Sequence, residues 1–80
     1  MNKHLVEFVE GNLKEIVWFL TPGGLISGNL HDIDKDAHSI GVTKAFHHTG
    51  SVKLYLGDIS INADQVSAWG LDEPTPPEEE

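Results

Sequence analysis

Arginine and cysteine, two residue types that proteins use for specialised chemistry, are absent from this 80-residue sequence. Without cysteine, the chain forms neither a disulfide framework nor a thiolate metal site. Without arginine, it lacks the side chain that most often reads phosphates and bases in a bidentate way. It also lacks an apolar run of about 18 residues, which a membrane-spanning helix needs, and no stretch has the pattern of a secretory signal. We therefore expect a cytoplasmic protein with a single folded domain.

Positive charge is scarce, because five lysines face thirteen Asp and Glu residues and the net charge is −8. The last nine residues, 72–80, hold five of these acids and three prolines, and they contain no lysine. Proline-rich acidic segments bury little apolar area and stay solvated. The sequence thus predicts a folded domain over residues 1–71, where eight acids and five lysines leave a net charge of −3. It predicts an acidic, proline-rich disordered tail over residues 72–80.

Hydrophobic patterning predicts one helix followed by five strands. Apolar residues recur at helical spacing over residues 2–11, after the N-cap candidate Asn2 and before the stop signal Gly11-Asn12. Runs of β-branched and aromatic residues, separated by turn residues, then predict strands over residues 16–20, 25–33, 38–46, 52–61 and 65–71. The expected turns and loops lie at 21–24, 32–37, 47–50 and 62–64.

Two glycines interrupt the apolar alternation and mark sharp bends. Gly28 lies in the middle of the second strand, and the alternation of the fourth strand shifts by one residue across Gly57, as in a β-bulge. Five short strands that bend this strongly close into a small barrel rather than forming two stacked sheets. The sequence therefore predicts a mainly β fold, with a short N-terminal helix followed by a strongly bent five-stranded antiparallel small barrel. The edges of so short a barrel invite pairing with a second copy.

Two short motifs in this arrangement resemble those of the Sm/LSm family. The first family motif spaces two glycines, a leucine and an aspartate at fixed intervals, and Gly23, Gly28, Leu30 and Asp34 have that spacing. The second motif has Arg-Gly between apolar residues, and the segment 61–66 is similar except that Asn-Ala replaces Arg-Gly. The resemblance covers roughly residues 3–70 and implies an Sm-like barrel, although other small barrels, such as SH3-like ones, share this strand bending.

The resemblance implies a homo-oligomeric ring of five to eight subunits. In such a ring the fourth strand of one copy, 52–61, pairs with the fifth strand, 65–71, of the next. Tyr55 lies in the opposite phase to its neighbours and is the candidate for an exposed aromatic, at a subunit interface or as a stacking platform. The residues expected at the subunit interface are Leu54, Tyr55, Leu56, Val66 and Trp69.

Short single-stranded RNA, often U-rich, is the ligand that the resemblance implies, bound near the inner rim of the ring. The positions that match the family's RNA-contact positions are Asp34, Asp36, His38, Asn62 and Ala63. Asp36 stands where the family has a stacking side chain and cannot stack on a base. His38 replaces an asparagine and can still stack or hydrogen-bond. Because Asn62 replaces the arginine, the usual uridine pocket is degraded in this sequence.

Three functional hypotheses stay open. The first is an RNA-binding ring, and the second is a ring-forming assembly or adaptor protein that has lost RNA binding and docks a basic partner through its acidic tail. The third is a metal-binding ring, since Asp32-x-Asp34-x-Asp36 opens like a calcium loop, although Ala37 and Thr43 replace the glycine and glutamate of such loops. Because the chain contains no catalytic motif, we expect no enzymatic activity, no cofactor and no resident metal.

Overall fold

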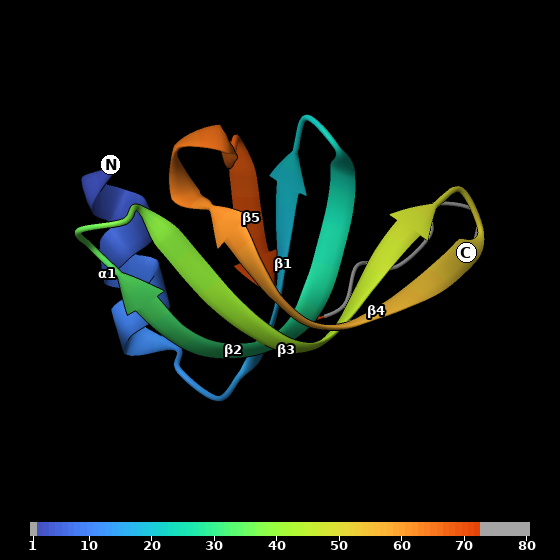
Figure 1. Cartoon of the computed structure of the whole chain (residues 1–80), viewed down its shortest axis with the longest axis horizontal. Coiled ribbons are helices and arrows are strands. Elements are labelled where there is room, and N and C mark those ends of the chain that lie inside the picture. Colours follow the sequence, from blue (N-terminus) through green and yellow to red (C-terminus); the bar gives the residue numbers. More distant parts are fainter. Residues whose placement is uncertain (1, 73–80) are drawn as a thin grey trace.

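The computed structural model describes residues 2–72 and shows one helix followed by five strands (Figure 1). The elements are α1 (Lys3–Gly11), β1 (Ile16–Thr21), β2 (Gly24–Asp34), β3 (Ser39–Thr49), β4 (Val52–Asn62), the 3-10 helix η1 (Ala63–Gln65) and β5 (Ala68–Leu71). The order predicted from the sequence is confirmed. The predicted tail over residues 72–80 lies outside the described residues except for Asp72.

α1 begins at a polar cap and packs through one apolar face. The Asn2 side chain accepts hydrogen bonds from the backbone N–H groups of His4 and Leu5 at 2.8 and 3.3 Å. These bonds satisfy donors that have no partner inside the helix. Leu5 and Val9, which lie one turn apart, are fully buried. No helix among residues 2–72 is long and apolar enough to cross a membrane.

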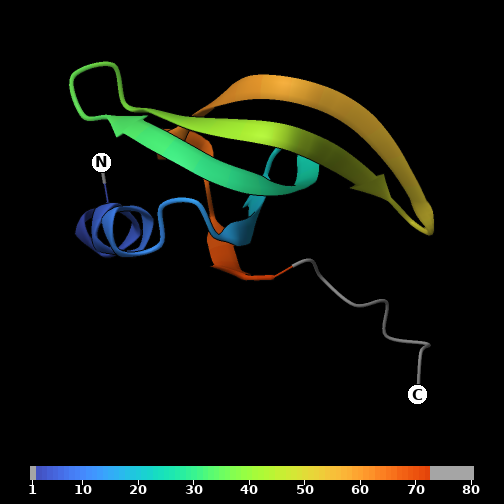
Figure 2. The same ribbon diagram turned by 90° about the horizontal axis from the view of Figure 1, so that it is seen from below.

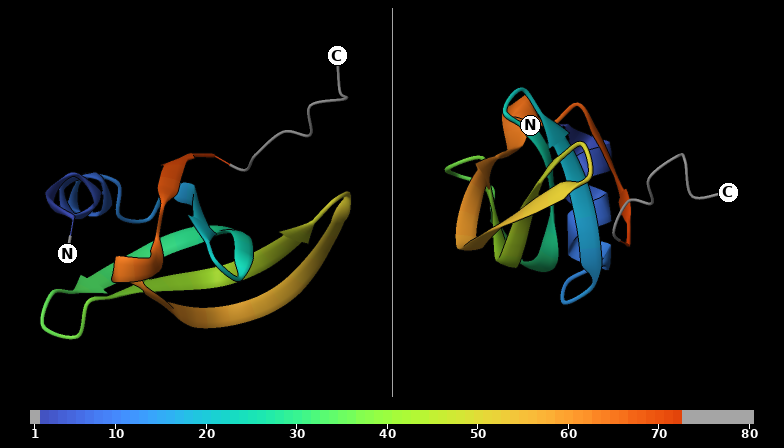
Figure 3. Two further views of the ribbon diagram at one scale, coloured as in Figure 1. Left: turned by 90° about the horizontal axis from the view of Figure 1, so that it is seen from above. Right: turned by 90° about the vertical axis from the view of Figure 1, so that its right-hand side faces the viewer.

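The five strands form one antiparallel sheet in the order β4-β3-β2-β1-β5. β4 and β5 are therefore the two edges of the sheet, and within residues 2–72 they do not pair with each other. The sheet curls strongly along β2, β3 and β4 (Figures 1 and 3). The strongly bent five-stranded antiparallel fold is thus confirmed, and the curled sheet stays open between β4 and β5.

The two glycines that were expected to bend the strands lie at irregularities in the sheet. The pairing of β2 with β3 shifts register between Ser27 and Asn29, on either side of Gly28. The pairing of β3 with β4 shifts register on both sides of Ala45, which lies opposite Gly57. Gly57 has φ +80°, a conformation that glycine adopts at little cost. Both bends predicted from the sequence are confirmed.

The core lies between α1 and the inner face of the curled sheet (Figure 2). Val17 and Phe19 point inward from β1 and are fully buried. The Phe8 ring of α1 packs edge-on against Phe19, with ring centroids 6.5 Å apart. Burying a side chain of this size stabilises the fold by roughly 1.5–3 kcal/mol. The buried apolar residues are Leu5, Val9, Val17, Phe19, Leu30, Ile40, Val42, Ala45, Ile61 and Ala63.

β3 continues three residues beyond its predicted end and reaches Thr49, so the turn expected at 47–50 starts later than predicted. His47 and His48 belong to the strand because they pair with β2. The Nε2–H of His47 donates to the Gly23 carbonyl at 2.9 Å, and Nε2 of His48 is hydrogen-bonded to Ser27 Oγ at 2.6 Å. His47 and His48 look like turn residues in the sequence. Their hydrogen bonds to β2 and to the turn before it hold them in the strand.

Replacing Gly28 by alanine is expected to destabilise the protein by about 1–3 kcal/mol, the usual cost of overpacking. A Cβ at this position would lie 2.5 Å from Val42 Cγ1 and 3.0 Å from the backbone of Ala45. Urea unfolding of the wild type and Gly28→Ala at one protein concentration measures the loss. Gly11→Ala is the matched control, since a Cβ there meets no atom within 4 Å. Equal stability of Gly28→Ala and wild type would contradict the close approach.

Candidate functional site

Two loops that are distant in the sequence meet at one end of the sheet. They are the β2–β3 loop, residues 35–38, and η1, which directly follows β4. The backbone N–H of Ala63 donates to the His38 carbonyl at 2.8 Å and joins them. Because the chain forms η1 here, β5 begins only at Ala68, three residues later than predicted.

Asp34 organises the β2–β3 loop from inside the chain. Its Oδ1 accepts hydrogen bonds from the backbone N–H groups of Asp36 and Ala37 at 3.0 and 3.1 Å, the pattern of an Asx turn. The loop then reaches His38, whose φ of +55° lies in the left-handed region. Asp36 is exposed on this loop. The role of Asp34 in this geometry is to shape the loop that presents Asp36 and His38.

A side-chain contact between His38 and Asp64 crosses from the β2–β3 loop to η1. The Nδ1–H of His38 donates to Asp64 Oδ2 at 2.7 Å, with both side chains about half exposed. This hydrogen bond lowers the pKa of Asp64 below the usual value for an aspartate. A charge-assisted hydrogen bond therefore holds the β2–β3 loop and η1 together.

Asn62 and Ala63 form the turn between β4 and η1. Asn62 caps η1, because its Oδ1 accepts a hydrogen bond from the backbone N–H of Asp64 at 2.9 Å. Ala63 is 2% exposed, so its side chain belongs to the core, and only its backbone takes part in the loop contact. The sequence pattern placed Asp64 in a turn but did not identify it as a site residue. Its hydrogen-bond partner, His38, lies 26 residues away in the sequence.

The structure places all five sequence-predicted RNA-contact residues in these loops or at the strand ends beside them: Asp34, Asp36, His38, Asn62 and Ala63. The surroundings are acidic, and the lysine of the β2–β3 loop, Lys35, is paired with Glu10 of α1 at 2.6 Å. Among residues 2–72, no group of three or more His, Asp or Glu side chains is arranged to hold a metal ion. The geometry therefore gives the calcium-loop hypothesis no support.

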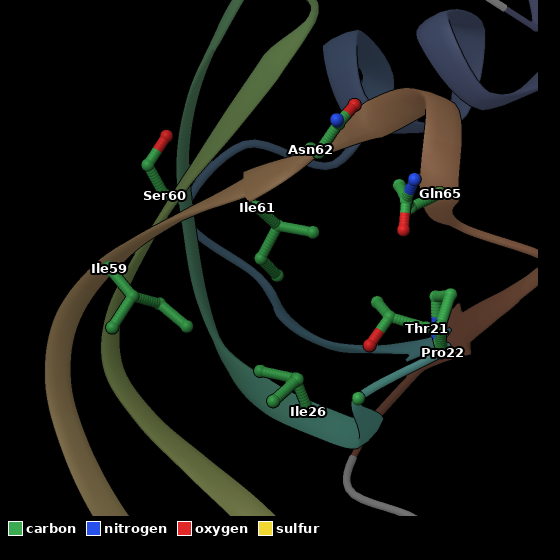
Figure 4. A pocket seen from close by; sticks show the side chains of 9 residues that line it. Thr21, Pro22, Ile26, Ile59, Ser60, Ile61, Asn62 and Gln65 are labelled. Carbon is green, nitrogen blue, oxygen red and sulfur yellow. The ribbon is translucent and has the colours of Figure 1, made fainter.

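A cavity of about 320 Å³ opens beside η1, between the β1–β2 turn and the end of β4 (Figure 4). Ile26, Ile59 and Ile61 form its apolar wall. The Gln65 side chain points into the cavity, whereas the Asn62 side chain points away from it (Figure 4). The volume is at the lower end of the range for small-molecule sites. Asn62 therefore lines the edge of this cavity and also caps η1.

The residues expected at a subunit interface divide into two groups. Leu54, Tyr55 and Leu56 of edge strand β4 are exposed, with 60%, 60% and 38% of their surface open to solvent. Val66 and Trp69 are partly buried and pack against the core of their own chain. The Trp69 ring lies 6.4 Å from the Phe8 ring of α1. The apolar surface available to another molecule is therefore concentrated on β4.

Removing the imidazole by His38→Ala is expected to raise the pKa of Asp64 toward its usual value, about 3.9. Since the pKa of Asp64 is lower in the folded protein, this group stabilises the fold above the unfolded-state pKa, and that contribution is lost as the pH falls through the folded-state pKa. A ¹³C NMR titration of the Asp64 carboxyl in both proteins measures the shift. His31→Ala is the matched control, and an unchanged Asp64 midpoint in His38→Ala would contradict the contact.

Comparison with known proteins identifies the fold. No protein-family model and no curated protein matches this chain. Among solved structures, a heptameric archaeal Sm protein superposes with a TM-score of 0.73 at 12% identity, covering 84% of this chain and 98% of that one. An Sm protein of Pyrococcus abyssii in complex with a uridine heptamer superposes with a TM-score of 0.71 at 22% identity, covering 84% of this chain and 96% of that one.

A third similar structure, an Sm-like protein from Archaeoglobus fulgidus, gives a TM-score of 0.71 at 21% identity and covers 84% of this chain and 92% of that one. The resemblance read from the two short sequence motifs is thus confirmed at the level of the fold. The sequence identities are low even though the three structures superpose over nearly their whole length. The chain is therefore a divergent protein of the Sm-like fold.

Proposed function

We propose that the chain assembles into a homo-oligomeric ring of five to eight copies, in which β4 of one copy pairs with β5 of the next, and that the two loops at its rim contact short single-stranded RNA. The observation that carries the assembly is the sheet order, which among residues 2–72 leaves the outer edge of β4 and the outer edge of β5 unpaired. Unpaired strand edges are templates for pairing with another chain. Two different edges on one molecule make a head-to-tail contact, which closes into a ring if the rotation allows.

The composition of the edges also supports assembly. β4 is 11 residues long and carries no proline, and Val52 and Leu54 on it are 62% and 60% exposed. Leu71 on β5 is 51% exposed. Exposed apolar residues on a long edge strand are a liability for a monomer, and pairing would cover them. The similar archaeal Sm protein is heptameric.

The double variant Leu54→Asp/Leu56→Asp is expected to convert the ring to monomers, because burying two unpaired carboxylates in an apolar contact costs much of their hydration energy. Light scattering coupled to size-exclusion chromatography measures the mass. Both residues are exposed in the single chain, so circular dichroism should show an unchanged fold. Leu13→Asp is the matched control, since Leu13 is 43% exposed but lies between α1 and β1. A wild type that is monomeric at micromolar concentration would overturn the ring.

RNA contact at the rim is supported by the side chains that the two loops expose. His38 uses Nδ1 for Asp64, so its Nε2 and its ring face are available to a base. Asn62 uses its side-chain oxygen to cap η1, so its amide N–H groups are available as donors. The similar Sm protein of Pyrococcus abyssii was solved in complex with a uridine heptamer. With no arginine in the chain, the contact would depend on histidine, amide and backbone groups.

Oligo-U single strands are expected to bind the ring at low salt, with an affinity that falls as salt rises. His38→Ala should weaken binding about fivefold or more, the lower bound for losing one stacked base. Fluorescence anisotropy of a labelled oligo-U strand measures both effects. His31→Ala is the matched control, because His31 is an exposed histidine of β2 outside the two loops. Equal affinity of wild type and His38→Ala for oligo-U would show that these two loops do not contact RNA.

A ring-forming assembly or adaptor protein without RNA binding is the second candidate function. It is favoured by the acidic surroundings of the rim and by the pairing of His38 with Asp64 and of Lys35 with Glu10. Both pairs occupy groups that would otherwise meet RNA. In this case the acidic segment 72–80 would dock a basic partner. A stable ring that binds no oligonucleotide at low salt, with the segment 73–80 removed, would establish this candidate over the first.

A further inference from the structure

A second cavity lies on the outer face of the sheet, where it crosses β1, β2 and β3. Its volume is about 180 Å³. The residues that line it are Ile16, Ser27, Gly28, Asn29, Lys44 and Phe46. Val17, the next residue after Ile16, is fully buried in the core. Since successive side chains of a strand point to opposite faces, Ile16 points outward, and this outer cavity is separate from the core and from the two rim loops.

The walls of the outer cavity are apolar and partly open to solvent. Ile16 is 49% exposed. The Phe46 ring is held edge-on against the Tyr55 ring, with centroids 5.2 Å apart. α1 packs on the opposite, inner face of the sheet (Figure 2). The cavity therefore offers a preformed apolar surface for a small side chain.

Lys44 adds one cation to this surface. It is exposed and lies where the pairing of β3 with β4 shifts register, with a φ of +52°. Irregularities of this kind re-aim the side chain of a strand residue. Asp58 Oδ1 accepts a hydrogen bond from the backbone N–H of Lys44 at 3.4 Å. Among residues 2–72, no carboxylate lies within ion-pair distance of the Lys44 ammonium group.

The size and lining of the outer cavity limit its occupant. Sites for free small molecules usually measure about 300–1,000 Å³, so this smaller cavity suits one or two side chains. A proline ring is compact and apolar, and proline-rich segments dock on aromatic-lined surfaces because their extended conformation exists before binding. A carboxylate beside the ring would meet Lys44. The chemistry that fits is therefore that of a proline-rich acidic segment.

The chain supplies such a segment beside the cavity. The backbone N–H of Asp72 donates to the Ile16 carbonyl at 2.7 Å, so the chain leaves β5 next to the cavity wall. Residues 73–80 then hold three prolines, four glutamates and no lysine. Eight residues at about 3.1 Å each span roughly 25 Å. The three strand spacings from β5 to β3 measure about 15 Å in total, so the segment is long enough to reach Lys44.

We propose that residues 73–80 fold back onto the outer cavity of their own subunit, with proline rings against Ile16 and Phe46 and a glutamate at Lys44. Charge complementarity favours this occupant, because its four carboxylates meet a lysine that has no ion pair among residues 2–72. The covalent connection favours it over a separate peptide, since a short link gives a millimolar effective concentration. The composition that keeps this segment from forming a core of its own does not prevent docking. The proposal depends neither on the ring nor on RNA binding.

Nuclear Overhauser contacts in the full-length protein test this docking. The expected contacts join the Ile16 δ1 methyl group to ring protons of Pro74, Pro76 or Pro77. The remaining proline of the chain, Pro22, follows the opposite end of β1 and cannot produce them. When ¹³C-labelled copies are diluted with unlabelled ones, contacts between labelled groups should persist, because both groups belong to one chain. Contacts that occur only between copies would overturn docking on the same subunit.

Lys44→Gln should reduce the intensity of these contacts about twofold, the size expected for losing a partly exposed ion pair. Lys3→Gln is the matched control, because Lys3 is exposed on α1, and circular dichroism verifies the fold of both variants. Equal intensities in wild type and Lys44→Gln would overturn the role of Lys44. Wild-type proline signals without any contact to Ile16 or Phe46 would overturn the proposal as a whole.

Discussion

The close approach of Gly28 to β3 is the constraint on which the rest of this structure depends. At this point β2 shifts register against β3, and no side chain larger than hydrogen fits between the strands. The shift lets β2, β3 and β4 curl around the core side chains of β1 and α1. A flat sheet would leave these side chains open to water, and so small a core tolerates little loss of buried area.

The same curl separates two kinds of surface. At the edges, β4 and β5 do not pair with each other, and the outer backbone groups of each strand are unpaired among residues 2–72. On the outer face, strand register brings the side chains of Trp18, Phe46 and Tyr55 into one row across β1, β3 and β4.

Charge is distributed in a way that the net value conceals. The β2–β3 loop and η1 are acidic, and His38 and Lys35 of the loop are engaged with Asp64 and Glu10. A protein with no arginine and a net charge of −8 would be expected to repel RNA at long range. At short range, the local composition decides which surface a polyanion can approach, and stacking supplies affinity that does not depend on charge.

The sequence by itself determined the order of elements, the N-cap at Asn2, the two bends and the motif spacing that resembles the Sm family. These features depend on local properties: apolar periodicity, capping and the freedom of glycine. Only the tertiary structure decided the contact between His38 and Asp64, the extension of β3 through His47 and His48, and the outer row of Trp18, Phe46 and Tyr55. Each of these depends on strand register, because a one-residue shift moves a side chain to the other face. Register is set by the packing of the whole sheet, which a local pattern does not contain.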